Sequence, residues 1–155
     1  NKVYEFNLQG SLSFGDLNDS SVIEVLSDGR VSSHFLERHL PLWFPELKFV
    51  SGCKDHDHIH ESLGLKYDQK CFTRRGCRFM PSSMIGAGRK FNEEKFLEKS
   101  NKLIYIICDI TELPKVQVMF KDGATLAQKY PNGVIHFKER ERFFSSQKMV
   151  DMQHG

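Results

Sequence analysis

The sequence predicts a single domain of the α/β (α+β) class, in which helices flank a mixed central β-sheet. The chain has 155 residues, which is long enough to bury one hydrophobic core. Apolar residues make up 39% and aromatic residues 12%, well above the content of a disordered chain. Helical and strand patterns follow in the order helix, strands, helix, strand, strand, which is typical of this class. No repeat or linker divides the chain, so one domain over 1–155 is expected.

Two helices are predicted before residue 41. A short helical stretch over 22–26 follows polar residues that can cap it. Ser32 or Ser33 can cap a second helix that runs through Leu40. Pro41 is expected to end this helix, because proline lacks a backbone N–H and its ring clashes with the preceding turn.

Strands are predicted in the middle of the chain. Residues 47–50 form a short strand, and 77–80 form another strand or a bent loop. Residues 65–73 alternate with period two, and one face of that strand carries Asp68 and Lys70.

A capped helix and a buried strand follow. Asn92 suits the N-cap of a helix that reaches about Ser100, and Phe91 and Phe96 stand at the two positions of a hydrophobic staple. Residues 103–110 are nearly all apolar, which predicts a strand buried on both faces. The remaining pattern predicts a strand at 116–120, a short helix at 124–130 and a last strand at 134–138.

The chemistry is expected on a hairpin that includes Asp68 and Lys70, which share one strand face because they are two residues apart. With a turn at 61–64, Asp57 faces Asp68 at about 4.5–5.5 Å between Cβ atoms. Two carboxylates at this distance repel each other unless a divalent cation lies between them. Mg²⁺ prefers one or two carboxylates together with waters and phosphate oxygens. Lys70 can orient or help to activate a metal-bound water.

The choice of Asp57 over Asp55 as the upstream metal ligand depends on the register of this hairpin. With the turn at 61–64, Asp55 faces Lys70 instead. A register shifted by two residues would exchange the roles of the two aspartates.

The pattern Asp…Asp-x-Lys on a hairpin, with a helix before it and a helix and a buried strand after it, resembles the PD-(D/E)XK nuclease superfamily. Many type II restriction endonucleases belong to that superfamily. The resemblance covers roughly residues 32–138, and it implies a restriction-endonuclease-like αβββαβ core. The leading proline of the family motif is missing, since Lys54 and His56 precede the two candidate aspartates.

The resemblance implies a Mg²⁺-dependent endonuclease that hydrolyses DNA phosphodiester bonds at a specific double-stranded site and acts as a homodimer. Carried over residue by residue, Asp57 and Asp68 would be the metal ligands and Lys70 the water-orienting lysine. Glu37 on the preceding helix would be an additional acid.

Other interpretations of these residues stay open at this point. The segment 57–60 (Asp-His-Ile-His) resembles the core of HNH (ββα-metal) nucleases, with His58 as general base, although the later cysteines and metal-binding histidine of that family are absent. Asp68 and Lys70 can instead form an ion pair on a solvated strand face. A structural zinc site is a further alternative, although its spacings match no common template; its ligands would be Cys53, His56, Cys71 and Cys77.

A basic segment after this strand is the candidate DNA contact. Lysine, arginine, hydroxyl and backbone N–H groups bind phosphates, and arginine also reads guanine edges. The net charge of +2 excludes a polycationic tail but allows a local basic groove. An ordinary charged loop, or a non-enzymatic module that binds single strands through basic and aromatic residues, is the alternative. The candidate DNA-binding residues are Arg74, Arg75, Arg78, Ser82, Ser83, Arg89 and Lys90.

Composition also sets expectations for cofactor and compartment. Four cysteines are too few for a disulfide scaffold, so reduced thiols in a cytoplasmic, bacterial-type intracellular protein are expected. No apolar run is long enough for a membrane span, and no signal-peptide pattern is present. The glycines match no phosphate-loop motif, so no nucleotide cofactor is expected. Mg²⁺, which the acidic pair suits and the resemblance implies, is the expected cofactor.

Overall fold

The structure is a computed structural model that describes residues 2–8, 14–51, 56–81, 84, 88–145 and 148–151. Its first half contains β1 (Lys2–Asn7), α1 (Asp19–Leu26), α2 (Gly29–Trp43), β2 (Leu47–Phe49), β3 (His58–His60), β4 (Leu65–Phe72) and β5 (Cys77–Arg78). The second half contains α3 (Glu93–Ser100), β6 (Ile104–Glu112), β7 (Lys115–Asp122), α4 (Gly123–Lys129), β8 (Val134–Ile135), the 3-10 helix η2 (Phe137–Glu139), α5 (Arg140–Ser145) and β9 (Lys148–Asp151).

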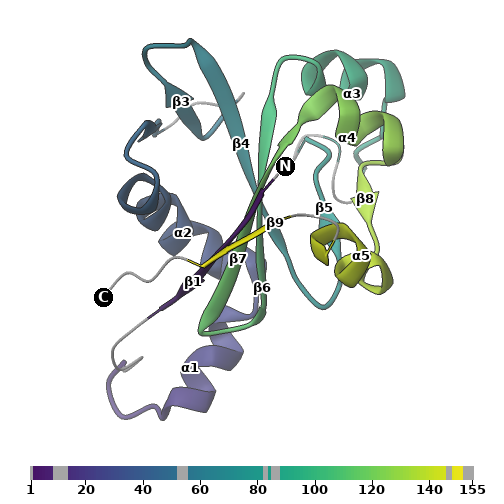
Figure 1. The fold of residues 1–155 in the computed structure, drawn as a ribbon. Helices are drawn as coiled ribbons and strands as arrows, with labels where there is room; N and C mark the ends of the chain where they lie inside the picture. The colour runs from purple at the N-terminus through teal and green to yellow at the C-terminus, as the bar shows by residue number, and fades with distance from the viewer. Residues whose placement is uncertain are drawn as a thin grey trace.

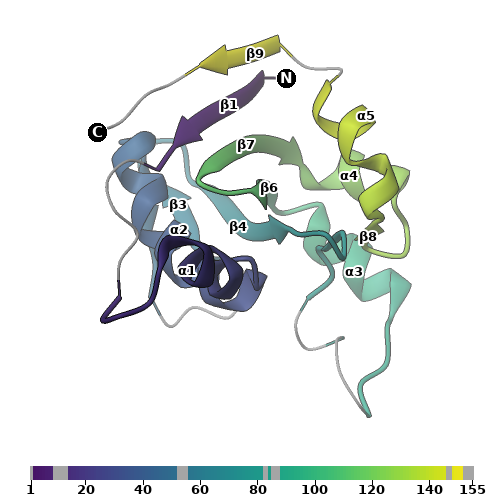
Figure 2. The same ribbon diagram turned by 90° about the horizontal axis from the view of Figure 1, so that it is seen from below.

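A mixed seven-stranded sheet forms the centre of the described part of the chain, in the order β2-β3-β4-β6-β7-β1-β9. Helices α1 and α2 lie on one side of it, and α3, α4 and α5 lie on the other (Figure 1, Figure 2). The predicted fold class, a mixed central sheet flanked by helices, is therefore confirmed.

The elements of the main sheet and its helices from α2 to β6 follow the expected αβββαβ order, and the two-residue strand β5, which belongs to a separate sheet, is inserted between β4 and α3. Strands β2, β3 and β4 are antiparallel neighbours, whereas β6 is parallel to β4. A parallel pair needs a crossover connection, and α3 lies within that connection. This arrangement places the hairpin β3–β4 beside the buried strand β6.

Strand β4 separates two hydrophobic cores, because successive side chains on a strand point to opposite faces. On one face, Tyr67 packs in a cluster with Leu40 and Trp43 of α2. On the other face, Phe72 packs in a cluster with Phe96 of α3. The α2 face and the α3 face of β4 are therefore distinct environments.

Helix α2 begins earlier than predicted. Asp28 caps it, because the Asp28 carboxylate accepts a hydrogen bond from the backbone N–H of Arg30 at 2.9 Å. Ser32 and Ser33 lie inside the helix instead, and the Ser32 hydroxyl donates to the carbonyl of Leu26.

Helix α2 also ends later than predicted, since it continues through Pro41 to Trp43. Leu40 and Trp43 are both buried in the core on the α2 face. This packing outweighs the backbone hydrogen bond that Pro41 removes, as tertiary burial commonly does for an amphipathic helix.

Helix α3 forms as predicted. The side chain of Asn92 accepts a hydrogen bond from the backbone N–H of Lys95 at 3.0 Å. The rings of Phe91 and Phe96 lie 5.5 Å apart between centroids, which is the expected staple.

The ends of the chain differ most from the sequence prediction. The predicted strand at 134–138 is a two-residue strand, β8, followed by η2, and β8 pairs with β5 in a separate two-stranded sheet. Strands β1 and β9 and helix α5 were not predicted, and β1 joins the main sheet between β7 and β9. No helix in the described ranges is long and apolar enough to cross a membrane.

Candidate functional site

The hairpin β3–β4 has the predicted register. His58 pairs with Tyr67 and His60 with Leu65. The connecting turn occupies 61–64, and Gly64 has a φ of 67°, a left-handed conformation that glycine adopts without strain. The ladder ends at His58 and Tyr67, and Asp57 lies in a bend just before β3, next to the end of the hairpin that is followed on β4 by Asp68.

Asp57 is hydrogen-bonded to the backbone of β4 through both its own backbone and its side chain. The backbone N–H of Asp57 donates to the carbonyl of Tyr67 at 2.8 Å. Its carboxylate oxygen Oδ2 accepts the backbone N–H of Gln69, also at 2.8 Å. These bonds hold the Asp57 carboxylate against β4. Asp55 lies outside the described residues, so the choice between the two aspartates stays a prediction.

Asp68 and Lys70 form a mostly buried ion pair on the α3 face of β4. Lys70 Nζ lies 3.4 Å from Asp68 Oδ2, and the two side chains are 19% and 14% exposed. Burial raises the pKa of Asp68 to about 7; Lys70 opposes this shift, whereas the carboxylate of Asp57 adds to it. Asp68 is therefore a carboxyl group that can gain or lose a proton near neutral pH.

We call Asp57, Asp68 and Lys70 the acidic–lysine cluster. Its two carboxylates fit the donor set of Mg²⁺, which commonly takes one or two protein carboxylates and completes its shell with water and phosphate oxygens. Because the pKa of Asp68 is about 7, a cation bound at this carboxyl group would take the place of its proton. Among the described residues, no group of three or more His, Cys, Asp and Glu side chains is placed to hold a metal ion.

His58 lies on the opposite, α2 face of the hairpin. It has no exposed surface, and its Nε2 donates to Gln69 Oε1 at 3.0 Å. Gln69 in turn donates from Nε2 to the carbonyl of Ser33 in α2 at 3.1 Å. Burial also lowers the pKa of His58. A general base must reach a water at the substrate, so this geometry does not favour the HNH interpretation.

Glu37 also lies with the α2 face. Its carboxylate is 3.8 Å from His34 Nδ1 and 3.7 Å from the Arg38 guanidinium. Its charge acts on His58 and Cys71, which belong to that face. The sheet therefore separates Glu37 from Asp68, and the expected role as an additional acid in the same site does not fit this placement.

The described members of the candidate zinc set do not form a metal site. Cys71 packs against the core of the α2 face, whereas Cys77 is buried in the core of the α3 face. Burial raises the pKa of both thiols to about 12, which disfavours the thiolate that binds zinc. Cys53 lies outside the described residues.

The predicted DNA-contacting arginines lie at the far end of β4. Arg74 and Arg75 form an exposed turn that Thr73 and Gly76 close through two backbone hydrogen bonds of 3.0 and 2.9 Å. Arg78 in β5 is exposed as well. Of the other candidates, Arg89 and Lys90 are exposed just before α3, and Ser82 and Ser83 lie outside the described residues.

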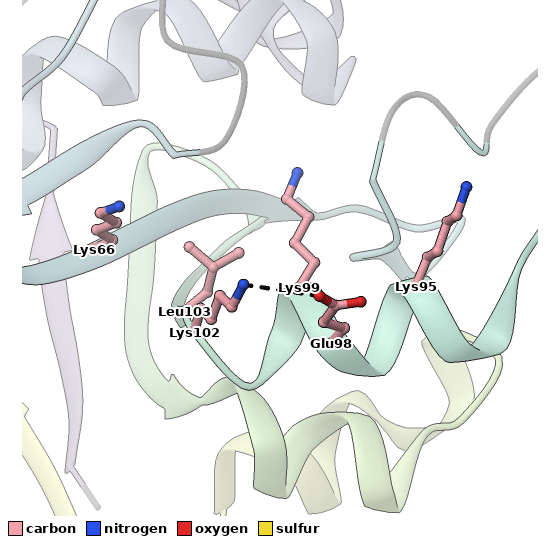
Figure 3. A pocket seen from close by; sticks show the side chains of 6 residues that line it. All are labelled: Lys66, Lys95, Glu98, Lys99, Lys102 and Leu103. Carbon is pink, nitrogen blue, oxygen red and sulfur yellow. Dashed lines mark ion pairs between the residues drawn. The ribbon is translucent and has the colours of Figure 1, made fainter.

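The structure also reveals a basic pocket that the sequence analysis missed. It has a volume of about 340 Å³ and lies between the start of β4 and helix α3 (Figure 3). A signal was present in the sequence, since Lys95 and Lys99 recur at helical spacing in α3, Lys102 follows just after the helix, and Lys66 is two residues before Asp68. The lining residues are Lys66, Lys95, Glu98, Lys99, Lys102 and Leu103.

Comparison with known proteins adds no assignment to this geometry. No family model, no curated protein and no solved structure matches the chain.

Proposed function

We propose that this protein is a Mg²⁺-dependent endonuclease that hydrolyses DNA phosphodiester bonds at the acidic–lysine cluster. One observation carries the proposal. The carboxylate of Asp57, which lies just before β3, acts on Asp68, which pairs with Lys70 on β4, and Asp68 is mostly buried with a pKa of about 7. Strongly perturbed carboxyl groups with a specific charged partner concentrate at functional sites.

A purely structural role explains this cluster less well. An ion pair between Asp68 and Lys70 would stabilise the fold best without a second negative charge beside it. Asp57 supplies such a charge, and it raises the pKa of Asp68 further. The arrangement is unfavourable for an isolated ion pair, whereas it suits a site that receives a divalent cation.

The roles proposed for the three residues follow from their chemistry. Asp57 and Asp68 would hold Mg²⁺, which stabilises negative charge on a phosphoryl oxygen and lowers the pKa of a bound water. Lys70 is held beside Asp68 at 3.4 Å, where its ammonium can orient the attacking water or a phosphate oxygen. In the net reaction, water adds across one P–O ester bond and leaves a phosphomonoester and a hydroxyl group.

The αβββαβ order of the core supports the proposed relation to the PD-(D/E)XK nucleases. The acidic–lysine cluster lies on the third strand of that order, β4, and just before the second, β3, beside the parallel strand β6. By this relation we propose cleavage of double-stranded DNA at a specific site by a homodimer, since cutting both strands of a symmetric site requires two active centres.

Digestion of supercoiled plasmid DNA tests the proposal. The purified chain should cut the plasmid in Mg²⁺ and leave it intact in chelator. The variant Asp68→Asn should lose cleavage but still retard DNA in a gel. Glu37→Gln is the matched control, because this change removes a carboxylate on the other face of the sheet, and it should cut like the parent.

The outcome also separates the alternatives. Discrete fragments of long DNA indicate a sequence-specific enzyme, and a smear indicates a non-specific nuclease. If the parent binds DNA but leaves it intact in both Mg²⁺ and Mn²⁺, the chain is a binding module and the nuclease proposal fails.

A further inference from the structure

We infer that the lysine pocket between β4 and α3 binds a backbone phosphate of the DNA strand, one or two nucleotides away from the bond that is cut. The location relative to the cut rests on the proposed function. The binding of a nucleic-acid phosphate rests on the pocket itself.

The pocket combines helix α3, the turn that follows it and strand β4. Lys95 and Lys99 are four residues apart in α3, so they lie along one side of the helix, and Lys102 lies in the turn just after the helix ends at Ser100. Phe96 of the same helix is buried in the core. Lys66 completes the pocket from β4 (Figure 3). Four ammonium groups from β4, α3 and the turn after α3 therefore gather around one cavity.

The charge of this lining is strongly unbalanced. The lining has four lysines and one glutamate, which give it a formal charge of +3. Glu98 compensates only Lys102, at 3.9 Å between Oε1 and Nζ, and both of these side chains are more than 70% exposed. Among the described residues, no acidic side chain forms an ion pair with Lys66 or Lys95. Like charges four residues apart on a helix repel each other, so an anionic ligand would relieve a cost that the free protein bears.

The pocket adjoins the acidic–lysine cluster on the same face of the sheet. Lys66 and Asp68 are two residues apart on β4, which places their backbone positions about 7 Å from each other. Lys99 is close enough to Asp68 to act on its charge. Phosphates of one DNA strand follow each other at about 3.4 Å of rise per nucleotide along the duplex axis. A strand with one phosphate at the cluster therefore has a neighbouring phosphate within reach of the pocket.

The composition of the lining favours phosphate over a base. Lysine presents a compact point charge that suits phosphate, whereas reading of base edges relies mostly on planar, bidentate groups. Leu103 is the single apolar side chain of the lining, which contains no aromatic ring on which a base could stack. The pocket therefore positions the strand and contributes no sequence preference.

Binding of a short fluorescein-labelled DNA duplex tests the inference, with fluorescence anisotropy measured in Ca²⁺ over a series of NaCl concentrations. The double variant Lys66→Gln/Lys95→Gln should bind about tenfold more weakly. Its plot of log affinity against log salt should be less steep by about 0.9 for each lost phosphate contact. The variant Lys66→Arg/Lys95→Arg should restore both values. Arg38→Gln, which removes one charge from α2 on the opposite face, should leave both unchanged.

Lys66 and Lys95 are exposed, so these substitutions should leave the melting temperature unchanged. If the double variant keeps the affinity and the salt slope of the parent, the pocket does not bind phosphate. The same conclusion follows if cleavage is lost while both binding values are unchanged. If the parent never cuts DNA but the double variant still loses affinity and slope, the phosphate pocket stands and only the nuclease proposal fails.

Discussion

Both faces of strand β4 carry polar side chains, but the hydrogen bonding and the charge of these side chains differ between the two faces. On the α2 face, His58 Nε2 donates to Gln69, and Gln69 donates to the backbone of α2 at Ser33, while His58 Nδ1 is buried without a hydrogen-bond partner among the described residues. On the α3 face, Asp68 pairs with Lys70, and burial and Asp57 make the charged form of Asp68 costly. Hydrogen-bonded side chains buried under a helix, such as His58 and Gln69, stabilise the fold. A buried carboxyl group with a second carboxylate beside it and a basic pocket nearby, such as Asp68, is typical of a site that binds a ligand.

The largest effect that we expect concerns the upstream aspartate. Asp57→Asn should lower cleavage by about 100-fold or more, because it removes a carboxylate from the cluster. Asp55→Asn should keep a measurable fraction of the activity. Plasmid cleavage rates for both variants, under one set of conditions, check this expectation. An inactive Asp55→Asn with an active Asp57→Asn would show that the catalytic assignment of the two residues is reversed, although the nuclease proposal would survive.

On the α2 face, the expected effect is on stability. His58→Ala should lower the free energy of unfolding by about 2–4 kcal/mol, because it leaves a cavity and an unpaired Gln69. Urea denaturation measures this change. His34→Ala, at a side chain that is 74% exposed, is the control and should change stability by less than about 0.5 kcal/mol.

The same His58 variant tests the division between the two faces. Below its melting temperature, folded His58→Ala should cleave DNA within a few-fold of the parent rate. A folded variant without cleavage would show that the α2 face takes part in the chemistry, and it would favour the HNH interpretation.

On the α3 face we expect a substitution to raise stability, whereas the His58 substitution on the α2 face lowers it. The folded-state pKa of Asp68 is about 7, above its ordinary value of 3.8, so the folded protein binds this proton more tightly than the unfolded chain. The stability of the parent should therefore fall as the pH rises from about 4 to 7. Asp68→Asn removes this dependence and should be more stable than the parent by on the order of 1–3 kcal/mol at pH 8, with no such gain below pH 4.

Urea denaturation of Asp68→Asn at both pH values measures this difference. Asp16→Asn, which changes an exposed aspartate, should show little change at either pH. An Asp68→Asn variant that is less stable than the parent at pH 8 would indicate that the ion pair with Lys70 is structural.

The smallest effect that we expect is on cation binding. A cation competes with the proton on Asp68, so the affinity for Ca²⁺ should rise by about tenfold between pH 6 and pH 8, across the pKa of about 7. Isothermal titration calorimetry at both pH values provides the measurement. An affinity that does not change with pH would mean that Asp68 is not a ligand.

Local patterns in the sequence predicted the centre of the fold well. The turn before Gly64, the period-two alternation of β4 and the cap at Asn92 act over a few residues, so neighbours in the chain suffice to specify them. They also predicted the register that brings Asp57 towards Asp68, since turn position alone sets the pairing of a hairpin. The acidic–lysine cluster was therefore predictable from sequence as a juxtaposition.

Only the tertiary structure decided which groups face each other across longer separations. Helix α2 extends through Pro41 because Leu40 and Trp43 are buried. The residues near Pro41 in the sequence do not predict this burial. The side of the sheet on which α2 packs separates Glu37 from Asp68. The position of α3 beside the start of β4 brings Lys66 together with Lys95 and Lys99 of the helix and Lys102 of the turn after it in one pocket. The sequence by itself determined the local register and the caps, since these depend on interactions between near neighbours, whereas the placement of helices on the sheet depends on burial summed over the whole chain.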